Sequence, residues 1–283
     1  MPLFVLLSGY LSRKKGYKDF WYSEGSLLAT LIVFELINFL LKYIIQGTII
    51  SLICPYRILW YLFSLICWRA FIQFMPDVIL KKRNLMISLS FIIMFCSCFI
   101  KNGYTLSISR TLSFFPFFLI GFYMDQTYLT SLRKKKRLGI VLLLIYMIMS
   151  ILITTFLGSD VKIFYRGAQG FNSLHLNTVS FVLIKGYVTI SAYIASMATL
   201  MIFSSENQCM GNEGKNSLMY YLYHYIIIEF VFTPFISYLG VTPNIALALF
   251  CTTVNIVIIK IATTNIFFYH MANPLPFIID KLK

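Results

Sequence analysis

The sequence is poor in charged residues, and poorest in acidic ones. Only 12% of its 283 residues are charged, with 10 Asp and Glu against 24 Lys and Arg. That charged fraction is about half of the share found in an ordinary soluble domain. Hydrophobic residues reach 59%, which is more apolar side chain than a water-soluble core of this length can enclose. The composition therefore excludes an ordinary soluble globular protein.

Patterns that bind metal or form disulfides are also missing from the sequence. The six cysteines lie mostly within apolar stretches, and none of them forms a C-x-x-C pair. Neither a zinc site nor a disulfide framework is indicated, so we expect free thiols, no metal and no bound cofactor. No internal repeat, low-complexity stretch or Pro/Gly-rich linker marks a domain boundary. We therefore expect residues 1–283 to form a single membrane-embedded domain.

The chain contains instead a series of long apolar stretches. A helix needs roughly 20 apolar residues to cross a membrane, and stretches of this kind recur along the sequence. They lack strict apolar/polar alternation and are too long for barrel strands, so helices are favoured. The predicted fold is an all-α, polytopic transmembrane bundle with about eight or nine spanning helices, the first one partial. The predicted spans are about 27–52, 58–80, 85–100, 108–124, 138–157, 177–203, 216–236 and 244–269.

Lys and Arg gather in every second connection between these stretches. Basic loops resist translocation, so such a bias sets the orientation of the chain in the membrane. It predicts a multi-pass protein of the plasma membrane, with basic loops and C-terminus in the cytoplasm and the connection 158–176 outside. The net charge of +14 is explained by these loops and by membrane lipid as a partner, and it does not indicate nucleic-acid binding. The basic loops contain Arg13–Lys15 with Lys18, Lys81–Arg83, Arg133–Arg137, Lys215, and Lys281 with Lys283.

The first residues of the chain are apolar but too few to cross a membrane. The segment from Met1 to Leu11 has no basic segment before it and does not have the form of a signal peptide. The charge bias places residue 1 outside, at the start of half a helix. We therefore expect that a first spanning segment is missing from this chain.

Four aromatic-rich stretches occur in order along the chain. They read M-P-L-F through S-G-Y, L-W-Y-L through W-R, R-T-L-S-F-F-P-F-F through a glycine, and G-K-N-S-L through Y-L-Y-H. Together they resemble the acyltransferase family 3 integral-membrane proteins, particularly the branch similar to fucose 4-O-acetylase. The stretches begin at Met1, Leu59, Arg110 and Gly214, and they end at Tyr10, Arg69, Gly121 and His224.

This resemblance implies a helix bundle that transfers an acyl group, usually acetyl from cytoplasmic acetyl-CoA, to a hydroxyl of a surface sugar. Acetyl-CoA or another acyl-CoA is then the donor substrate, and a cell-surface or exopolysaccharide glycan is the acceptor. The family carries a basic residue and a His on the helix before the present start, and often a second His directly before M-P-L-F. The resemblance therefore implies that the catalytic His lies upstream of Met1, and we expect residues 1–283 alone to be inactive.

Two arginines are candidates for binding the substrates. Acyl transfer to an alcohol needs a base near the hydroxyl. It also needs cationic side chains that bind the phosphates of the donor, a task for which Arg is best suited. A basic side chain at the centre of a membrane helix costs roughly 2.5–3.5 kcal/mol, so it normally faces a partner or a water-filled cavity. Arg69 lies midway along its predicted span. Arg110 is near the start of its span, so its side chain can alternatively extend to the membrane–water interface. Trp60 and Tyr61, in the same stretch as Arg69, are further substrate-binding candidates.

Of the three histidines, His175, His224 and His270, one lies in a polar stripe. His224 shares a helix face with Ser217 and Tyr221, which we take as substrate-binding candidates. His224 is a candidate for the base that takes the proton of the hydroxyl. The alternative is a core histidine that donates a hydrogen bond to a neighbouring carbonyl.

The predicted spans also contain other charged side chains. We expect the carboxylates of Glu35 and Glu229 to pair with Lys42, Arg69 or Lys260. Lys185 and Lys260 are also placed to extend to the membrane interface. The outer connection 158–176 mixes side chains suited to stacking on and hydrogen-bonding a sugar, although an ordinary polar loop looks much the same. These side chains are Tyr165, Arg166, Gln169, Asn172 and His175.

The sequence leaves two further functions open. A polytopic transporter or flippase for a glycan or small molecule also has intramembrane charges and aromatic-rich helices, but transporters often contain paired or repeated segments. An inactive, truncated acyltransferase is the other alternative. The acceptor sugar, the acyl group and the oligomeric state are not determined by the sequence.

Overall fold

The chain folds as an all-α protein, as predicted. A computed structural model describes residues 1–49, 54–100, 105–167, 177–203, 214, 216–240 and 244–275. Helices make up nearly all of this described part, and no strand occurs in it. The chain divides into two compact units, of which unit 1 contains Met1–Lys15 and Cys67–Glu206, and unit 2 contains Gly16–Ile66 and Asn207–Lys283.

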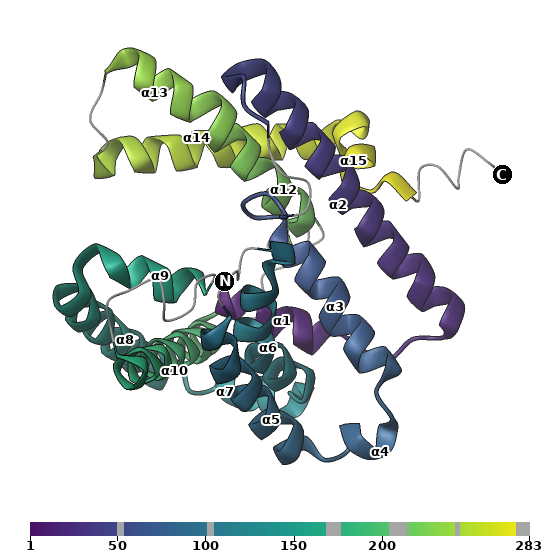
Figure 1. Ribbon diagram of the computed structural model, residues 1–283, viewed down its shortest axis with the longest axis vertical. Coiled ribbons are helices and arrows are strands. Elements are labelled where there is room, and N and C mark those ends of the chain that lie inside the picture. The colour runs from purple at the N-terminus through teal and green to yellow at the C-terminus, as the bar shows by residue number, and fades with distance from the viewer. Residues whose placement is uncertain are drawn as a thin grey trace. The chain divides into compact units, whose positions relative to one another are not determined.

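Each unit is a helical bundle, and α3 (Trp60–Phe74) carries residues of both (Figure 1). Unit 1 contains α1 (Pro2–Leu11), α4 (Asp77–Leu80), α5 (Arg83–Cys96), α6 (Ile108–Phe122), α7 (Gln126–Arg133), α8 (Lys136–Leu157), α9 (Val161–Arg166) and α10 (Thr178–Ile202). Unit 2 contains α2 (Tyr17–Gln46), α12 (Ser217–Ile227), the π-helix η5 (Ile228–Phe232), α13 (Thr233–Leu239), α14 (Ile245–Thr264) and α15 (Ile266–Ala272). The short helices η1 (Ser97–Phe99), η2 (Thr105–Ser107) and η3 (Gly158–Asp160) also belong to unit 1.

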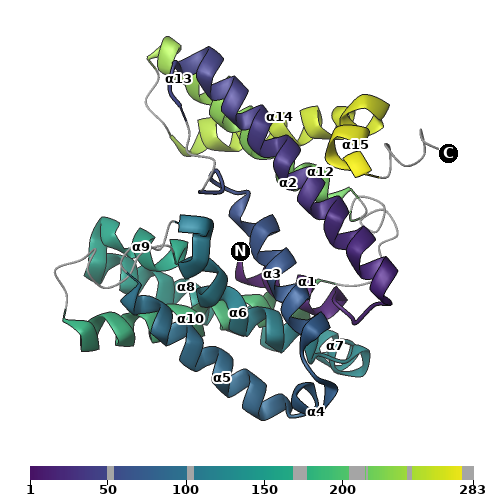
Figure 2. The ribbon, with the colours of Figure 1, turned by 45° about the vertical axis from the view of Figure 1, so that its right-hand side comes forward.

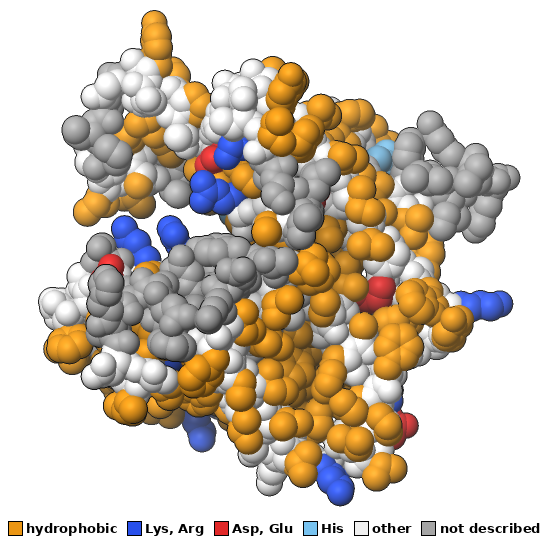
Figure 3. Space-filling view, viewed as in Figure 1, with side chains coloured by type: hydrophobic (Ala, Val, Ile, Leu, Met, Phe, Trp, Pro, Cys, Tyr) orange, Lys and Arg blue, Asp and Glu red, His pale blue; other side chains and the backbone are white. Residues whose placement is uncertain are grey.

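Several of these helices can cross a membrane. Five helices of the described chain are long and apolar enough to do so. Three shorter apolar helices have 10–17 residues, so the predicted number of eight or nine spans stays a prediction. Large hydrophobic side chains remain exposed on many helices, and they cover much of the face drawn in Figure 3. The five long helices are Tyr17–Gln46, Lys136–Leu157, Thr178–Ile202, Ser217–Tyr238 and Ile245–Thr264.

A helix occurs in each predicted apolar stretch, but three predicted spans differ from the helices. The span predicted at 244–269 is divided at Asn265, between α14 and α15. The span predicted at 27–52 is a helix from Tyr17 to Gln46, which ends where Gly47 adopts a left-handed φ of 63°. The span predicted at 58–80 is divided, because α3 ends at Phe74 and Pro76 precedes α4. A proline disfavours helical backbone in the residue before it, so the helix ends there.

Two glycines allow α1 and α6 to pack closely within unit 1. A Cβ atom on Gly9 would overlap the carbonyl of Phe118, and one on Gly121 would overlap the carbonyl of Leu6. The two backbones therefore meet where neither residue has a side chain, the kind of small-residue contact that membrane helices favour. Figure 2 shows α5 beside α6 in the same unit, in agreement with their contacts.

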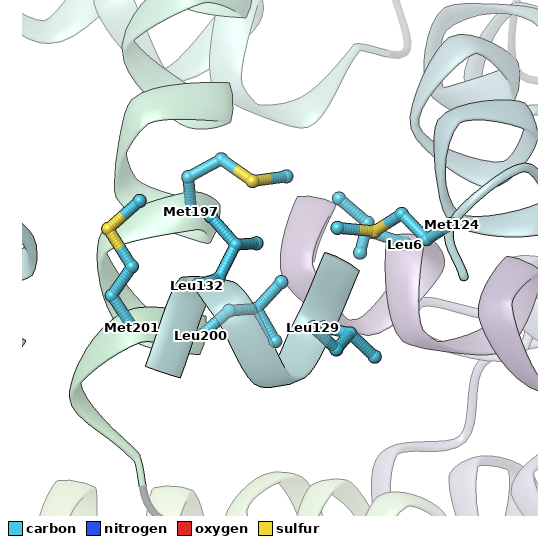
Figure 4. Packing of buried hydrophobic residues seen from close by; sticks show 7 residues of the cluster. All are labelled: Leu6, Met124, Leu129, Leu132, Met197, Leu200 and Met201. Carbon is cyan, nitrogen blue, oxygen red and sulfur yellow. The ribbon is translucent and has the colours of Figure 1, made fainter. Parts of the chain in front are cut away.

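The helices α1, α7 and α10 share one hydrophobic cluster of unit 1 (Figure 4). It contains Leu6 from α1, Leu129 and Leu132 from α7, and two methionines and a leucine from α10, together with Met124. A second cluster joins η1 to α9 and α10, where the rings of Phe164 and Phe181 lie 4.7 Å apart. The clusters pack opposite ends of α10, since Met197, Leu200 and Met201 belong to the first, and Phe181 and Val188 to the second.

Three basic segments lie at the same end of unit 1. Lys14 Nζ pairs with Asp77 Oδ1 at 2.5 Å, and its hydrogen bond and charge hold the pKa of the Asp77 carboxyl below the usual range. Tyr123 Oη, directly after α6, donates to the carbonyl of Leu80 at 2.6 Å. The segments Arg13–Lys15, Lys81–Arg83 and Arg133–Arg137 therefore gather where α1 and α6 end and α5 and α8 begin. The connection that contains α9 lies at the opposite end, as the alternating charge pattern predicts.

In unit 2, α12 packs against α14, α15 and α2. Tyr223 Oη donates to the carbonyl of Phe268 at 3.0 Å, and its ring lies edge-on to Phe34 at 5.3 Å. Thr30 Oγ1 donates to the carbonyl of Ala272 at 3.0 Å, which ties α2 to the end of α15. These contacts hold the helix that carries the predicted polar stripe.

Candidate functional site

The structure places the two predicted arginines in unit 1, each next in the chain to one partner of a hydrogen bond between α3 and α6. Trp68 Nε1 donates a hydrogen bond of 3.0 Å to the carbonyl of Thr111, and Arg69 and Arg110 each adjoin one of these residues in the chain. Both arginines are half-buried, and the Nε atom of Arg69 is buried. Arg110 lies in the first turn of α6, in agreement with the predicted start of that span. Two cations on adjacent helices are suited to a polyanionic ligand.

Four of the other predicted residues form an aromatic cluster in unit 2. The ring centroids of Tyr61 and Tyr221 lie 5.3 Å apart, and those of Trp60 and Tyr61 lie 6.2 Å apart. Tyr221 is 6.1 Å from the ring of His224, and its hydroxyl donates to the carbonyl of Ile58. The start of α3 therefore packs against α12 through residues that the sequence analysis singled out. Ser217, in contrast, is exposed at the first turn of α12.

His224 has one fixed ring nitrogen. Its Nδ1 lies 2.9 Å from the carbonyl oxygen of Tyr220, one turn earlier. A carbonyl only accepts hydrogen bonds, so Nδ1 carries the proton and the neutral ring keeps the lone pair on Nε2. Asn255 Nδ2, from α14, donates to the carbonyl of His224 at 3.1 Å and holds this turn of α12. The bond is the one expected of a core histidine, and it also leaves Nε2 able to act as a base.

A polar network in unit 2 was not predicted as a unit. The backbone N–H of Tyr56 donates to Glu35 Oε1 at 2.8 Å, and Tyr56 Oη lies 3.2 Å from Glu229 Oε1. Lys42 Nζ donates to the same hydroxyl at 3.2 Å, while Tyr225 Oη donates to Glu229 Oε2 at 2.9 Å. The expected pairing of Glu229 with Lys42 thus runs through the hydroxyl of Tyr56. Glu229 lies in a π-helix, a local distortion that is frequent at functional sites.

Unit 1 contains a cavity of about 360 Å³ along α10. Its wall includes Tyr165, one of the side chains predicted to contact a sugar, and Lys185. The prediction that Lys185 extends to the membrane interface is wrong, because the residue is only 5% exposed. It lies on the face of α10 that is turned to α6, where Nζ donates to Ser113 Oγ at 2.9 Å.

A group of serines surrounds the ammonium of Lys185. Ser113 Oγ lies 3.1 Å from Ser97 Oγ and 3.5 Å from the carbonyl of Gly167, to which it donates. Ser109 Oγ donates to that same carbonyl at 3.1 Å. Ser109 and Ser113 are four residues apart on α6, a spacing that places both on one face and was the signal available in the sequence.

Some predicted residues lie outside the described part of the chain. These are Gln169, Asn172 and His175 of the outer connection and the basic residues Lys215, Lys281 and Lys283. Among the residues that are described, the cysteines are free, and no group of three His, Cys, Asp or Glu side chains is placed to hold a metal ion.

The fold and these sites define a multi-pass membrane protein with polar groups inside its helical units. A family model described as "Acyltransferase domain" matches residues 1–263. The chain belongs to this family, acyltransferase family 3, and the match includes both arginines, the aromatic cluster and His224. No curated protein and no solved structure matches the chain.

Proposed function

We propose that the protein transfers an acetyl or other acyl group from acyl-CoA, on the cytoplasmic side of the plasma membrane, to a hydroxyl of a cell-surface or exopolysaccharide sugar. The observation that carries this proposal is the match of the acyltransferase family to residues 1–263, which contain every candidate site residue. The long apolar helices, with polar side chains buried inside each unit, support an active site within the membrane.

The proposed reaction joins a sugar oxygen to the acyl carbon. The oxygen attacks the thioester carbonyl, the carbon–sulfur bond breaks, and CoA leaves as a thiolate that takes up a proton. An alcohol is a poor nucleophile until a base takes its proton. The family resemblance assigns the base to a His of the helix that precedes M-P-L-F. Among the described histidines, His224 is suited to assist it, since its Nδ1–H donates to Tyr220 and leaves the lone pair on Nε2.

Binding of the donor is assigned to cationic side chains. The phosphates of CoA are polyanionic, and Arg binds phosphate oxygens with two parallel hydrogen bonds. Arg69 and Arg110 adjoin the Trp68–Thr111 hydrogen bond, which brings their helices together. The three basic segments at one end of unit 1 attract the same anion over a longer range. The aromatic cluster of Trp60, Tyr61 and Tyr221 provides a surface for the substrates.

Reconstitution tests the proposal. The protein is expressed from its own gene, purified, and placed in liposomes with radiolabelled acetyl-CoA and a mixture of cell-surface glycans. We expect release of CoA that depends on the glycans, together with alkali-labile label in the glycan fraction. Release of CoA without any labelled glycan, or no release with correctly inserted protein, would contradict an O-acyltransferase.

A further inference from the structure

We propose that the cavity of unit 1 binds a carboxylated sugar, with the carboxylate on Lys185 Nζ. This assignment deepens the proposed function, because it names the class of acceptor, and it rests on that function only in taking the ligand to be an acceptor glycan. The observations that lead to it are a buried cation, its incomplete neutralisation and the chemistry of the cavity wall.

The first observation is the position of Lys185. It follows the first residue of α10, Thr178, by seven positions, which places it about 10 Å inside the helix end. A charged side chain at such depth is costly unless a partner or a polar cavity compensates it, so intramembrane cations usually mark a ligand pathway. Lys185 is buried and also lines the cavity. It therefore reaches the space that a ligand would fill.

The second observation is the weakness of the partner that the protein supplies. Within the described residues, Ser113 Oγ is the acceptor that lies within hydrogen-bond distance of Lys185 Nζ. A hydroxyl is neutral, and an ammonium carries three N–H donors. Ser113 is itself engaged with Ser97 and with the carbonyl of Gly167. As far as the described residues extend, the positive charge and the remaining donors of Lys185 are therefore available to an anion.

The third observation is the wall of the cavity. Its volume of about 360 Å³ lies within the range of ligand pockets, roughly 300–1,000 Å³, which are mostly apolar with a few convergent polar groups. The rings of Phe117, Tyr146 and Tyr165 and the hydroxyls of Thr189 and Ser196 are among its described lining groups. Aromatic faces with scattered hydroxyls suit a sugar ring better than they suit a fatty acyl chain or an inorganic ion.

The charge of the cavity favours a carboxylate over a phosphate. Lys185 is the single Lys or Arg among the described residues that line it. Phosphate sites usually combine several donors, with Arg as the preferred partner, because the phosphate group carries more charge and three acceptor oxygens. Among the described side chains of the wall, the one ammonium balances one carboxylate. A uronic acid within the acceptor glycan matches both this charge and the aromatic wall.

Binding of monosaccharide probes tests the assignment without any need for catalysis. The full chain, purified in nanodiscs, is titrated with glucuronate, glucose and glucose 6-phosphate. We expect glucuronate to bind roughly tenfold more tightly than glucose, the effect of one charge-assisted hydrogen bond, and more tightly than glucose 6-phosphate. Lys185→Met should remove the preference for glucuronate. Lys162→Met, which removes an exposed cation of the same unit, should retain it.

Three results would overturn the assignment. They are equal or absent binding of glucuronate and glucose by the wild type, a preference for glucose 6-phosphate, and a preference for glucuronate that survives in Lys185→Met. The wild-type ratio decides the question even if Lys185→Met does not fold. Failure of the proposed function is distinguishable, because the binding ratio does not depend on acyl transfer. Conversely, acyl transfer without a glucuronate preference would leave the function in place and refute the acceptor class.

Discussion

Polar side chains inside this protein are held by neighbours from the same unit. His224 donates to a carbonyl of its own helix, Lys185 donates to a serine of α6, and Glu229 accepts from two tyrosines. In a membrane an unsatisfied polar group is expensive, so such bonds fix both the rotamer and the helix face that turns inward. The same bonds leave His224 Nε2 and the ammonium of Lys185 with capacity for a ligand.

Replacement of His224 separates catalysis from packing. Gln in place of His keeps a side chain that can donate a hydrogen bond but removes the ring nitrogen that takes a proton. We expect His224→Gln to lower the rate of acyl transfer by roughly 10²–10⁴ in the liposome assay, with normal amounts of protein in the membrane. His270→Gln, on α15, is the matched control and should remain active. Normal activity of His224→Gln would make His224 a packing residue.

Replacement of Arg69 tests the role of the arginine pair. Leu in place of Arg69 removes an intramembrane charge, so insertion should be undisturbed. We expect acyl transfer to fall roughly a hundredfold or more, the usual effect of removing one positioned donor from an active site. Lys162→Leu, at an exposed position, should be harmless. If Arg69→Leu kept the wild-type rate, Arg69 would serve only packing or pairing.

The sequence predicts some of these residues better than others. Spacing along a helix is sufficient to put Tyr221 and His224 on one face, and the structure brings them together. Lys185 is misjudged, because a long side chain near a helix end can either extend to the interface or turn inward, and only the position of α6 decides between these. Tyr56 is missed because it lies in an irregular segment before α3, where periodicity carries no signal.

At the scale of helices, close packing depends on residues that have no side chain. Gly9 and Gly121 belong to two of the stretches that resemble the family, and they lie where α1 and α6 come closest. Their structural role is sufficient to explain their presence in those stretches. Pro116 lies buried inside α6, in the same stretch as Gly121.

A single methyl group added at this contact should separate the helices. In Gly121→Ala the new Cβ would overlap the carbonyl of Leu6, and overpacking of this kind costs roughly 1–3 kcal/mol. We expect a lower thermal midpoint of the purified protein and lower activity. Gly186→Ala is the matched control, since its Cβ would meet Phe95 at an ordinary 3.8 Å. Equal stability of the two variants would show that the α1–α6 contact is looser than described.

Hydrophobic stretches predict the helices but not all of their ends. The segment Tyr17–Gly25 is helical although it contains Asp19 and Glu24, so a prediction based on apolar length begins too late. Glu24 is nevertheless buried, which only the surrounding helices explain. The stop at Phe74 is readable from Pro76, whereas the π-helix that contains Glu229 has no sequence signature.

At the scale of the whole chain, the charge pattern and the structure of unit 1 agree. The basic segments Arg13–Lys15, Lys81–Arg83 and Arg133–Arg137 lie at one end of the unit, and the connection with α9 lies at the other. The chain divides into two compact units, whereas the family match covers both of them up to residue 263. That residues 1–283 form one domain therefore stays a prediction.

Labelling of single cysteines tests the proposed orientation in the membrane. The six native cysteines are replaced by serine, and one cysteine is introduced at the exposed position Lys134 or Lys162. In intact cells, an impermeant thiol reagent should label Lys162→Cys and leave Lys134→Cys unlabelled, since basic loops remain in the cytoplasm. The opposite pattern would invert the topology. Lysed cells serve as the control, in which both positions should react.

The most direct test of the account is the O-acetyl content of surface glycan in a host that lacks its own glycan O-acetylation. The gene is expressed in this host, and ester-linked acetyl is measured on the isolated glycan. The account predicts that the wild type adds alkali-labile acetyl groups and that Arg69→Leu, at the same level in the membrane, does not. The account would be contradicted if correctly inserted wild-type protein left the O-acetyl content of the glycan at the level of the host alone. This would have to hold both for glycans that contain uronic acids and for neutral ones.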